Sequence, residues 1–411
     1  MSDAEILYDP YALKWGEEIH FPSTRSVKEY GNRIYNRYPA RSIFLVPRAI
    51  LANKTGLNIL DPFMGSGTTA IEAVLTGNHA YGLEMDPFAR LVAESSSAVF
   101  SDLDIAKIKS YFQKISLSWQ EYAPADIPSL KGIERWFKGN DLMDLLKLKT
   151  AILELSPKDY LPFFLVTFAD AIKPVSLMER QSLKPYISTK FVKETKSVPD
   201  SFKYSFGAHM SAMQDMQMLG IEGGGITWLG DDATDFSAPE DLIDIAITSP
   251  PYINALDYTR CVKIEGSLCD TIDDSVAATL RETQVGHERR RKQDISEVVE
   301  AVFSKYFSAI APLDLQRAET CRAYFNDIHK NLQCVFRALK SRGEYHIIVG
   351  DNTIKGIDIP THDLIQCLAE NVGFEPFGYY FYEIRDHRTS IPRNNAKSKI
   401  NVEHVLMLRK P

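Results

Sequence analysis

Short apolar runs that end in Gly or Asp recur along the chain, and this pattern constrains the fold more than any other feature. Such runs are typical of buried parallel strands with functional loops at their carboxyl ends. We predict five of these strands at Leu57–Leu60, His79–Leu83, Ile226–Leu229, Ile243–Thr248 and Glu344–Val349, and two more at Phe374–Tyr382 and Val402–Leu408. Helical patterns lie between them, at Thr68–Leu75, Phe88–Ser95 and Phe325–Leu339. The alternation predicts an α/β fold with a doubly wound, mostly parallel sheet of seven strands.

The strands are unevenly spaced, which indicates insertions into the α/β unit. Residues 101–224 separate the second strand from the third, carry helical patterns of their own and end in a glycine triplet at Gly223–Gly225. We predict that they form an inserted domain. Residues 262–320 are charged and mostly helical in pattern, and they form a second predicted insertion. Residues 1–100 and 225–411 then make up one discontinuous domain.

Composition excludes several classes of protein. No apolar run approaches the roughly 20 residues of a membrane helix, and the acidic N-terminus lacks the basic start of a secretory signal. The five cysteines are scattered without a C-x-x-C pair, so neither a disulfide framework nor a zinc site is indicated. A reducing cytoplasm fits best. The net charge of −7 argues against binding nucleic acid through bulk charge, although local basic clusters remain possible.

The first candidate site lies where the predicted strand Leu57–Leu60 gives way to a helix, in Asp61-Pro-Phe-Met-Gly-Ser-Gly-Thr-Thr69. Gly65 and Gly67 allow a tight turn and the close approach of a ligand to the backbone. The segment lacks Gly-Lys-Ser/Thr and G-x-G-x-x-G, so it is neither a P-loop nor a dinucleotide fingerprint. An Asp at a strand end faces a cation better than a phosphate, and S-adenosylmethionine carries positive charge on its sulfonium and methionine groups.

Acidic residues also end the next two strands. Glu84, with Asp86 as the second choice, can accept hydrogen bonds from the hydroxyls of a ribose. Asp232, with Asp231 as the runner-up, can accept a hydrogen bond from an adenine amino group. Each carboxylate alone is more often a solvated surface residue or part of a turn. Three acidic strand ends in this chain order together indicate a site for S-adenosylmethionine.

The second candidate site is Ser249-Pro250-Pro251-Tyr252, at the end of the strand Ile243–Thr248. Two prolines make this turn rigid and leave carbonyl oxygens exposed. Hydrogen bonds from an exocyclic amino group to the Ser249 hydroxyl and the Pro250 carbonyl would make its lone pair available for methylation. Tyr252 can stack on the base, which must be flipped out of a duplex to reach the pocket. Alone, the tetrapeptide could be a simple strand-ending turn.

These residues resemble the amino-methyltransferases of DNA. Asp61–Thr69 is similar to the first motif of that family, and Ser249–Tyr252 to its catalytic tetrapeptide. Tyr38-Pro39-Ala40-Arg41 resembles a Tyr-Pro-Ala-Lys segment that walls the cofactor site, with Arg in place of Lys, and Glu403–Leu406 resembles the final strand. The resemblance implies a Rossmann-like S-adenosylmethionine-dependent methyltransferase fold. The predicted cofactor-binding residues are Tyr38, Asp61, Phe63, Gly65, Gly67, Thr68, Glu84, Met85, Asp231 and Asp232, and the predicted catalytic residues are Ser249, Pro250, Pro251 and Tyr252.

The resemblance covers roughly residues 35–100, 225–260 and 325–410, with the cofactor segment before the catalytic one, which is the unpermuted order. Ser in the first position of the tetrapeptide is typical of cytosine-N4 enzymes, whereas adenine-N6 enzymes more often carry Asp or Asn. We therefore expect a site-specific DNA cytosine-N4 methyltransferase, cytoplasmic and of prokaryotic or phage type, with a cognate restriction endonuclease as a candidate partner. The alternatives are adenine-N6 methylation, methylation of RNA or protein, and a cofactor-binding protein without catalysis. The chemistry requires no metal, and no metal-binding cluster is evident in the sequence.

Double-stranded DNA is the expected partner, and three basic segments are candidates for contacting it. The first, in the predicted insertion, is Lys173–Tyr204, which interleaves Lys173, Arg180, Lys184, Lys190, Lys193, Lys196 and Lys203 with Tyr186, Phe191, Phe202 and Tyr204. The second is Gly286–Lys292, with three consecutive arginines, and the third is Arg385–Lys399. The first could equally be a solvated loop, and runs like the second are often charged helix faces. The sequence does not distinguish which insertion recognises the target.

Overall fold

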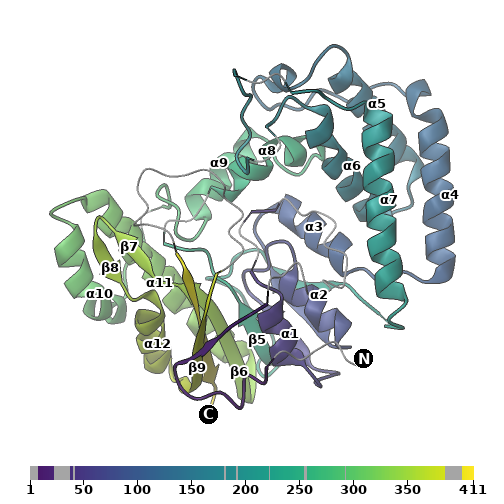
Figure 1. Ribbon diagram of the computed structural model, residues 1–411. Coiled ribbons are helices and arrows are strands. Elements are labelled where there is room, and N and C mark those ends of the chain that lie inside the picture. The colour runs from purple at the N-terminus through teal and green to yellow at the C-terminus, as the bar shows by residue number, and fades with distance from the viewer. Residues whose placement is uncertain are drawn as a thin grey trace.

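The computed structural model describes residues 8–22, 38–39, 42–179, 182–190, 193–221, 223–253, 257–291, 293–384 and 400–411. An eight-stranded sheet of order β1-β9-β10-β6-β5-β2-β3-β4 lies at its centre (Figure 1). The strands are β1 (Glu17–Ile19), β2 (Asn58–Asp61), β3 (His79–Leu83), β4 (Ile226–Gly230), β5 (Ile243–Thr248), β6 (Leu339–Gly350), β9 (Glu375–Glu383) and β10 (Val402–Arg409). A separate two-stranded hairpin consists of β7 (Asn352–Ile354) and β8 (Ile357–Ile359).

The sheet is mostly parallel, as predicted, and the seven predicted strands are all present. β4, β3, β2, β5 and β6 pair in parallel, and β10 runs antiparallel between β6 and β9. The expected number of strands was one too low, because β1 adds a parallel edge strand beside β9. With only three residues, Glu17–Ile19, this strand is too short to show a hydrophobic pattern in the sequence.

Chain order reverses next to β2, and this reversal positions the candidate site. From β2 the chain proceeds outward to β3 and β4, then returns to add β5 and β6 on the opposite side of β2. Open α/β sheets bind ligands at such a switch point, outside the carboxyl ends of the strands. Asp61, the last residue of β2, therefore adjoins the end of β5, although 187 residues separate it from Thr248.

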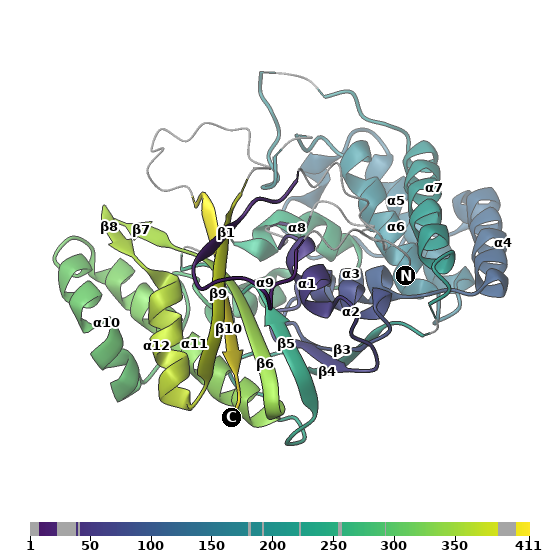
Figure 2. The same ribbon diagram turned by 60° about the horizontal axis from the view of Figure 1, so that its bottom comes forward.

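Alternate residues of the central strands pack against layers on opposite faces of the sheet. Ile59 and Ile348 belong to a core that includes α1 (Leu45–Leu51), α2 (Thr68–Leu75) and part of α3 (Pro87–Ser97). Leu60 and Ile347 belong to a second core, formed with α10 (Glu297–Ile310), α11 (Leu315–Ala338) and α12 (Thr361–Val372). This alternation gives the three-layer arrangement seen in Figure 2.

A helical lobe, at the upper right of Figure 1, has a hydrophobic core that also includes Phe88, Ala89 and Val92 of α3. It contains α4 (Asp102–Ser118), α5 (Asp141–Leu155), α6 (Leu161–Val175) and α7 (Val198–Gln217), with the short 3-10 turns Trp119–Glu121 and Ile133–Trp136. It also contains α8 (Tyr258–Leu268) and part of α9 (Asp274–Thr283), which follow β5 in the chain. Residues 262–320 thus divide between two cores, because α10 packs on the sheet with α11 and α12.

Two expectations from composition can be compared with the structure. All five cysteines are free thiols, and four of them are buried. Among the helices that the structure describes, none has both the length and the apolar character needed to span a bilayer.

Candidate active site

A pocket of about 960 Å³, counting the part open to solvent, lies at the carboxyl ends of β2, β3, β4 and β5. It brings together eleven of the fourteen predicted site residues: Tyr38, Asp61, Phe63, Gly65, Thr68, Glu84, Met85, Asp231, Asp232, Ser249 and Pro251. Gly67, Pro250 and Tyr252 are not among the lining residues. Segments that are far apart in the sequence therefore converge on one cavity.

Asp61 joins the two strands at the switch point. It is buried, and its Oδ1 accepts hydrogen bonds from the Thr248 hydroxyl at 2.6 Å and from the Phe63 backbone N–H at 3.0 Å. Burial raises the pKa of Asp61 to about 6, although these hydrogen bonds oppose the rise. Sequence reasoning missed Thr248, the residue just before the catalytic tetrapeptide. It ties that tetrapeptide to the cofactor segment.

Glu84 holds the glycine turn from the neighbouring strand. Its Oε2 accepts a hydrogen bond from the Gly65 N–H at 2.7 Å, and its Oε1 accepts one from the Asp86 N–H at 2.8 Å. Gly65 adopts a φ of +53°, which glycine accommodates most easily. Burial, followed by the nearby charge of Asp86, raises the pKa of Glu84 to about 7. Each carboxylate oxygen retains a lone pair that a ligand hydroxyl can use.

Asp86, the second choice for the ribose, has a structural role as the N-cap of α3. Its Oδ1 accepts from the backbone N–H groups of Phe88 and Ala89 at 2.9 and 3.4 Å. Burial raises the pKa of Asp86 to about 6. Gly67 is also structural. It has a φ of +88°, and an added Cβ would lie 3.1 Å from the Cα of Ala93, so glycine lets α2 begin against α3.

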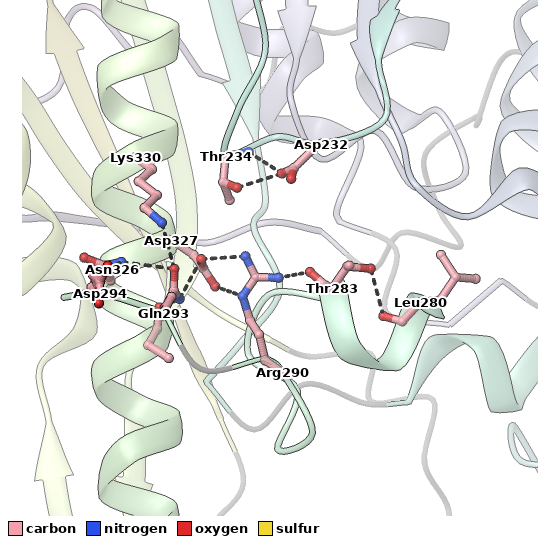
Figure 3. Close-up of polar contacts among 11 residues, drawn as sticks. Asp232, Thr234, Leu280, Thr283, Arg290, Gln293, Asp294, Asn326, Asp327 and Lys330 are labelled. Carbon is pink, nitrogen blue, oxygen red and sulfur yellow. Dashed lines mark hydrogen bonds and ion pairs between the residues drawn. The ribbon is translucent and has the colours of Figure 1, made fainter. Parts of the chain in front are cut away.

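The third strand end offers two carboxylates. Oδ1 of Asp232 accepts hydrogen bonds from the backbone N–H and the hydroxyl of Thr234, at 2.8 and 2.7 Å (Figure 3). This local turn accounts for the conformation of Asp232 and fixes it at the pocket. Asp231 is exposed and lines the same pocket. Both residues predicted for the adenine end therefore lie where a ligand could reach them.

The donors and acceptors of this pocket fit S-adenosylmethionine. Asp61 and Asp86 are buried and Glu84 is partly buried at this pocket, and none of the three forms an ion pair with a cation in the described part of the chain. A cationic ligand would supply the missing positive charge. The N-terminus of α2, which begins at Thr68 on the pocket wall, provides backbone N–H groups and a positive dipole end for the ligand carboxylate.

The catalytic tetrapeptide borders the same cavity. Ser249 and Pro251 line the pocket, whereas Pro250 is buried behind them. The Tyr252 hydroxyl donates a short hydrogen bond to Glu403 on β10, which also accepts one from the Tyr382 hydroxyl at 2.5 Å. Burial and the Glu403 charge hold the pKa of Tyr252 well above its usual value, so the phenol stays protonated. The signal for Glu403 in the sequence is an acidic residue within the apolar strand Val402–Arg409.

Comparisons with known proteins agree on one family. A family model described as DNA methylase matches residues 28–95. The Type II methyltransferase M.MvaI of Kocuria varians is 22% identical over 93% of this chain and 90% of that protein. The Type II methyltransferase M.BsoBI of Geobacillus stearothermophilus is 20% identical over 82% of this chain and 76% of that protein.

These matches support the family predicted from the sequence, the DNA amino-methyltransferases. The predicted methyltransferase fold agrees with these relatives and with the mostly parallel sheet, and the pocket residues fit S-adenosylmethionine as the cofactor. Among solved structures, a Thermus thermophilus protein described as a candidate DNA modification methylase, complexed with S-adenosylmethionine, is 21% identical. It matches over 43% of this chain and 50% of that chain, with a TM-score of 0.23.

The opposite wall of the methyltransferase pocket comes from α8, α9 and the residues after α9, which sequence reasoning did not find. Its members are Tyr258, Thr259, Leu280, Thr283, Gln284 and Val285. Arg290 anchors this wall to α11, because its guanidinium donates to the Thr283 carbonyl and pairs with the buried Asp327, with Nη2 2.6 Å from Oδ1 (Figure 3). Gln293 also donates to Asp327, at 2.9 Å. Arg290, predicted as a possible DNA contact, thus has a structural role.

The other basic candidates of the methyltransferase divide in a similar way. Lys173 donates to the Ser182 carbonyl at 2.7 Å, and Lys193 donates to three backbone carbonyls, so both brace the segment between α6 and α7. The exposed members of that segment are Lys184, Tyr186, Lys190, Lys196, Lys203 and Tyr204. Arg289 is exposed, and Arg291 pairs with Glu282 at 2.7 Å. Ala40, Arg41, Arg180, Phe191, Lys292 and the whole segment Arg385–Lys399 lie outside the described residues.

Proposed function

We propose that this DNA methyltransferase transfers a methyl group from S-adenosylmethionine to N4 of cytosine, in a base flipped out of double-stranded DNA. One observation carries the proposal: the Ser249 turn and the Asp61 and Glu84 carboxylates border one cavity. A cofactor held on the carboxylate side would therefore present its methyl group toward the turn. The Thr248–Asp61 hydrogen bond of 2.6 Å fixes the two halves in register.

The cofactor supplies an electrophilic methyl group, and the residues of the chain prepare the acceptor. The Ser249 hydroxyl and the Pro250 carbonyl accept hydrogen bonds from the two hydrogens of the amino group, which draws the nitrogen toward tetrahedral geometry. The nitrogen lone pair then forms the new bond to carbon while the bond from carbon to sulfur breaks, and one amino proton leaves to solvent. Positioning supplies most of the rate enhancement. Tyr252, held through its hydroxyl by Glu403, would support the base from behind the turn.

Serine at position 249 favours cytosine over adenine as the substrate. The resemblance to cytosine-N4 enzymes rests on this residue, because adenine-N6 enzymes more often place Asp or Asn there. Adenine-N6 methylation is the second candidate, since the same pair of acceptors can bind any exocyclic amino group. The names of the two relatives, both Type II methyltransferases, support a role in restriction–modification and hence a cognate endonuclease as partner.

We propose that the helical lobe, residues 101–224 with α8 and α9, contributes to binding the target DNA. Lys184, Lys190 and Lys196, with Tyr186, are exposed on the segment before α7, and Lys203 and Tyr204 are exposed on α7 itself. Lys184 lies close enough to α8 to oppose the rise in the pKa of Cys261 that burial causes. Cations and aromatic rings near one edge of the pocket suit a phosphate backbone.

The product of the reaction tests the proposal directly. Purified protein is incubated with S-adenosylmethionine and unmethylated DNA of diverse sequence, and the nucleosides are identified by mass spectrometry. We expect N4-methylcytosine, and its loss in Ser249→Ala. N6-methyladenine would retain the mechanism and overturn the assignment of cytosine. If neither nucleoside forms although the protein binds the cofactor, DNA amino methylation by this site is wrong.

A further inference from the structure

Asp351, His362 and His404 form a cluster that no motif in the sequence suggested. Asp351 directly follows β6, His362 lies in the first turn of α12, and His404 lies on β10. One potential ligand atom from each residue lies within 4.8 Å of the other two. The fold therefore assembles two imidazoles and a carboxylate at the carboxyl edge of the sheet, on the far side of β5 from the cofactor carboxylates.

The distances within the cluster are close to those around a bound metal. Oδ1 of Asp351 lies 2.7 Å from Nδ1 of His362, and Oδ2 lies 3.6 Å from Nε2 of His404. Two ligands of a tetrahedral zinc ion lie about 3.3 Å apart, given bonds of roughly 2.0–2.1 Å. The imidazole rings are parallel, with centroids 3.9 Å apart, so a modest rotation of each ring would direct its nitrogen at a shared ion.

The remaining nitrogen of each imidazole has its own partner. Nε2 of His362 faces Oδ1 of Asp363 at 3.3 Å, and Nδ1 of His404 is 2.8 Å from the Tyr379 hydroxyl. When these outer nitrogens carry the protons, the inner nitrogens present their lone pairs to the cluster. Histidines that bind metals almost always have such an outer partner, which fixes the tautomer and the ring orientation.

We propose that Asp351, His362 and His404 bind one divalent transition-metal ion, with Zn²⁺ as the preferred species. Two imidazoles and one carboxylate suit Zn²⁺ far better than Mg²⁺ or Ca²⁺, which prefer oxygen ligands. The side chain of Asp351 is 37% exposed whereas those of His362 and His404 are 15% and 12% exposed, so an ion can enter past the carboxylate. Three protein ligands leave a fourth position for water.

The proposed ion would stabilise the strand that supports Tyr252. His404 follows Glu403, the acceptor of the Tyr252 hydroxyl, and successive side chains of a strand point to opposite faces. The metal would thus link β10 to β6 and α12 on one face while Glu403 holds the Tyr252 ring on the other. This role is structural and requires no metal in the methyl transfer.

Zinc binding by the full-length protein tests the site. Tag-free protein in a Cys367→Ser background, which removes the exposed thiol on α12, is stripped with a chelator and titrated with Zn²⁺ against a chromophoric competitor. We expect one equivalent bound, no comparable binding of Mg²⁺, and a rise in melting temperature. The affinity for Zn²⁺ should fall more than about 100-fold in His362→Ala and His404→Ala, and about tenfold in Tyr379→Phe. His79→Ala, an exposed histidine at the start of β3, is the matched control.

Asp351→Asn keeps the shape of the cluster and serves if either alanine variant fails to fold. The proposal is overturned if the stripped protein binds no equivalent of Zn²⁺. It is equally overturned if the His362, His404 and Asp351 variants bind Zn²⁺ as tightly as the His79 control does. Asp351 would then be a carboxylate that accepts a hydrogen bond from His362 and lies beside His404. Metal binding is measured without DNA or S-adenosylmethionine. Its outcome is therefore independent of whether the protein methylates cytosine.

Discussion

The two walls of the cofactor pocket are held in place in different ways. The wall made of strand ends is fixed by the backbone N–H groups of Gly65 and Asp86, which donate to Glu84, together with one bond across the switch point. The wall made of α8 and α9 is anchored from behind by Arg290, which reaches Asp327, 37 residues away. The first wall supplies the carboxylates and the catalytic turn of the pocket, whereas the second mainly determines the shape of the pocket. Substitutions in the two walls should therefore affect different measurements.

The largest expected effect is on stability and belongs to the helical wall. Arg290→Met leaves the fully buried Asp327 without its cation, which should lower the free energy of unfolding by about 3–5 kcal/mol. Urea denaturation measures the change. The double variant Arg290→Met/Asp327→Leu should lose less than the sum of the two single variants, since it buries no uncompensated charge. Additive losses would show that the two side chains do not act as a pair.

Ser249→Ala tests the wall of strand ends and should leave stability nearly unchanged. Removing one hydrogen-bond acceptor from the amino group should reduce kcat by about 10²–10³-fold, by analogy with loss of a single oxyanion-hole donor. Affinity for S-adenosylmethionine should stay within about twofold, which calorimetry can measure. The matched control is Ser304→Ala, an exposed serine on α10. A fully active Ser249→Ala enzyme would remove the hydroxyl from the mechanism.

Glu84→Gln should produce a smaller effect, confined to cofactor binding. The amide oxygen still accepts the Gly65 N–H, but the negative charge is lost, so affinity for S-adenosylmethionine should fall roughly tenfold. S-adenosylhomocysteine, which lacks the sulfonium charge, should lose less. Equal losses for the two ligands would mean that Glu84 acts only through hydrogen bonds, and unchanged affinity for both would remove it from the site.

Sequence reasoning predicted the first wall much better than the second. Strand-end residues such as Asp61 and Glu84 follow recognisable apolar runs, and parallel strands bring their ends to one edge, so their convergence follows from the fold class. Leu280 and Val285 have no such signal, because their wall is anchored by a long-range pair, Arg290 with Asp327 on α11. Charge alone was misleading at Arg290, since a basic run does not reveal which of its members is buried.

Long-range pairings were invisible for the same reason. The sequence predicted the strand Val402–Leu408, but the partner of Glu403 lies 151 residues away, on the catalytic turn. The cluster of Asp351, His362 and His404 joins the ends of three elements at spacings that match no metal motif. Local motifs indicate which groups at a strand end can bind a ligand. Only the folded sheet shows which distant side chains contact those groups.

The last expected effect is a dependence on pH that separates the two walls. Burial raises the pKa of Glu84 to about 7 and those of Asp61 and Asp86 to about 6, so the folded cofactor-free protein binds protons more tightly than the unfolded chain. Its stability should therefore fall as pH rises from about 4.5 to 7, by on the order of 1 kcal/mol per pH unit for each titrating group.

A bound cationic ligand should oppose this loss of stability with rising pH, because it favours the ionised carboxylates. Thermal denaturation should show a larger stabilisation by S-adenosylmethionine at pH 8 than at pH 6, and a weaker pH dependence for S-adenosylhomocysteine. Glu84→Gln should reduce this difference in stabilisation between pH 8 and pH 6, since it removes the group with the highest of the three carboxyl pKa values. Arg290→Met should leave it unchanged, because its wall contributes no carboxylate to the pocket. The same stabilisation at both pH values would mean that the three carboxyl groups do not meet the positive charge of the cofactor.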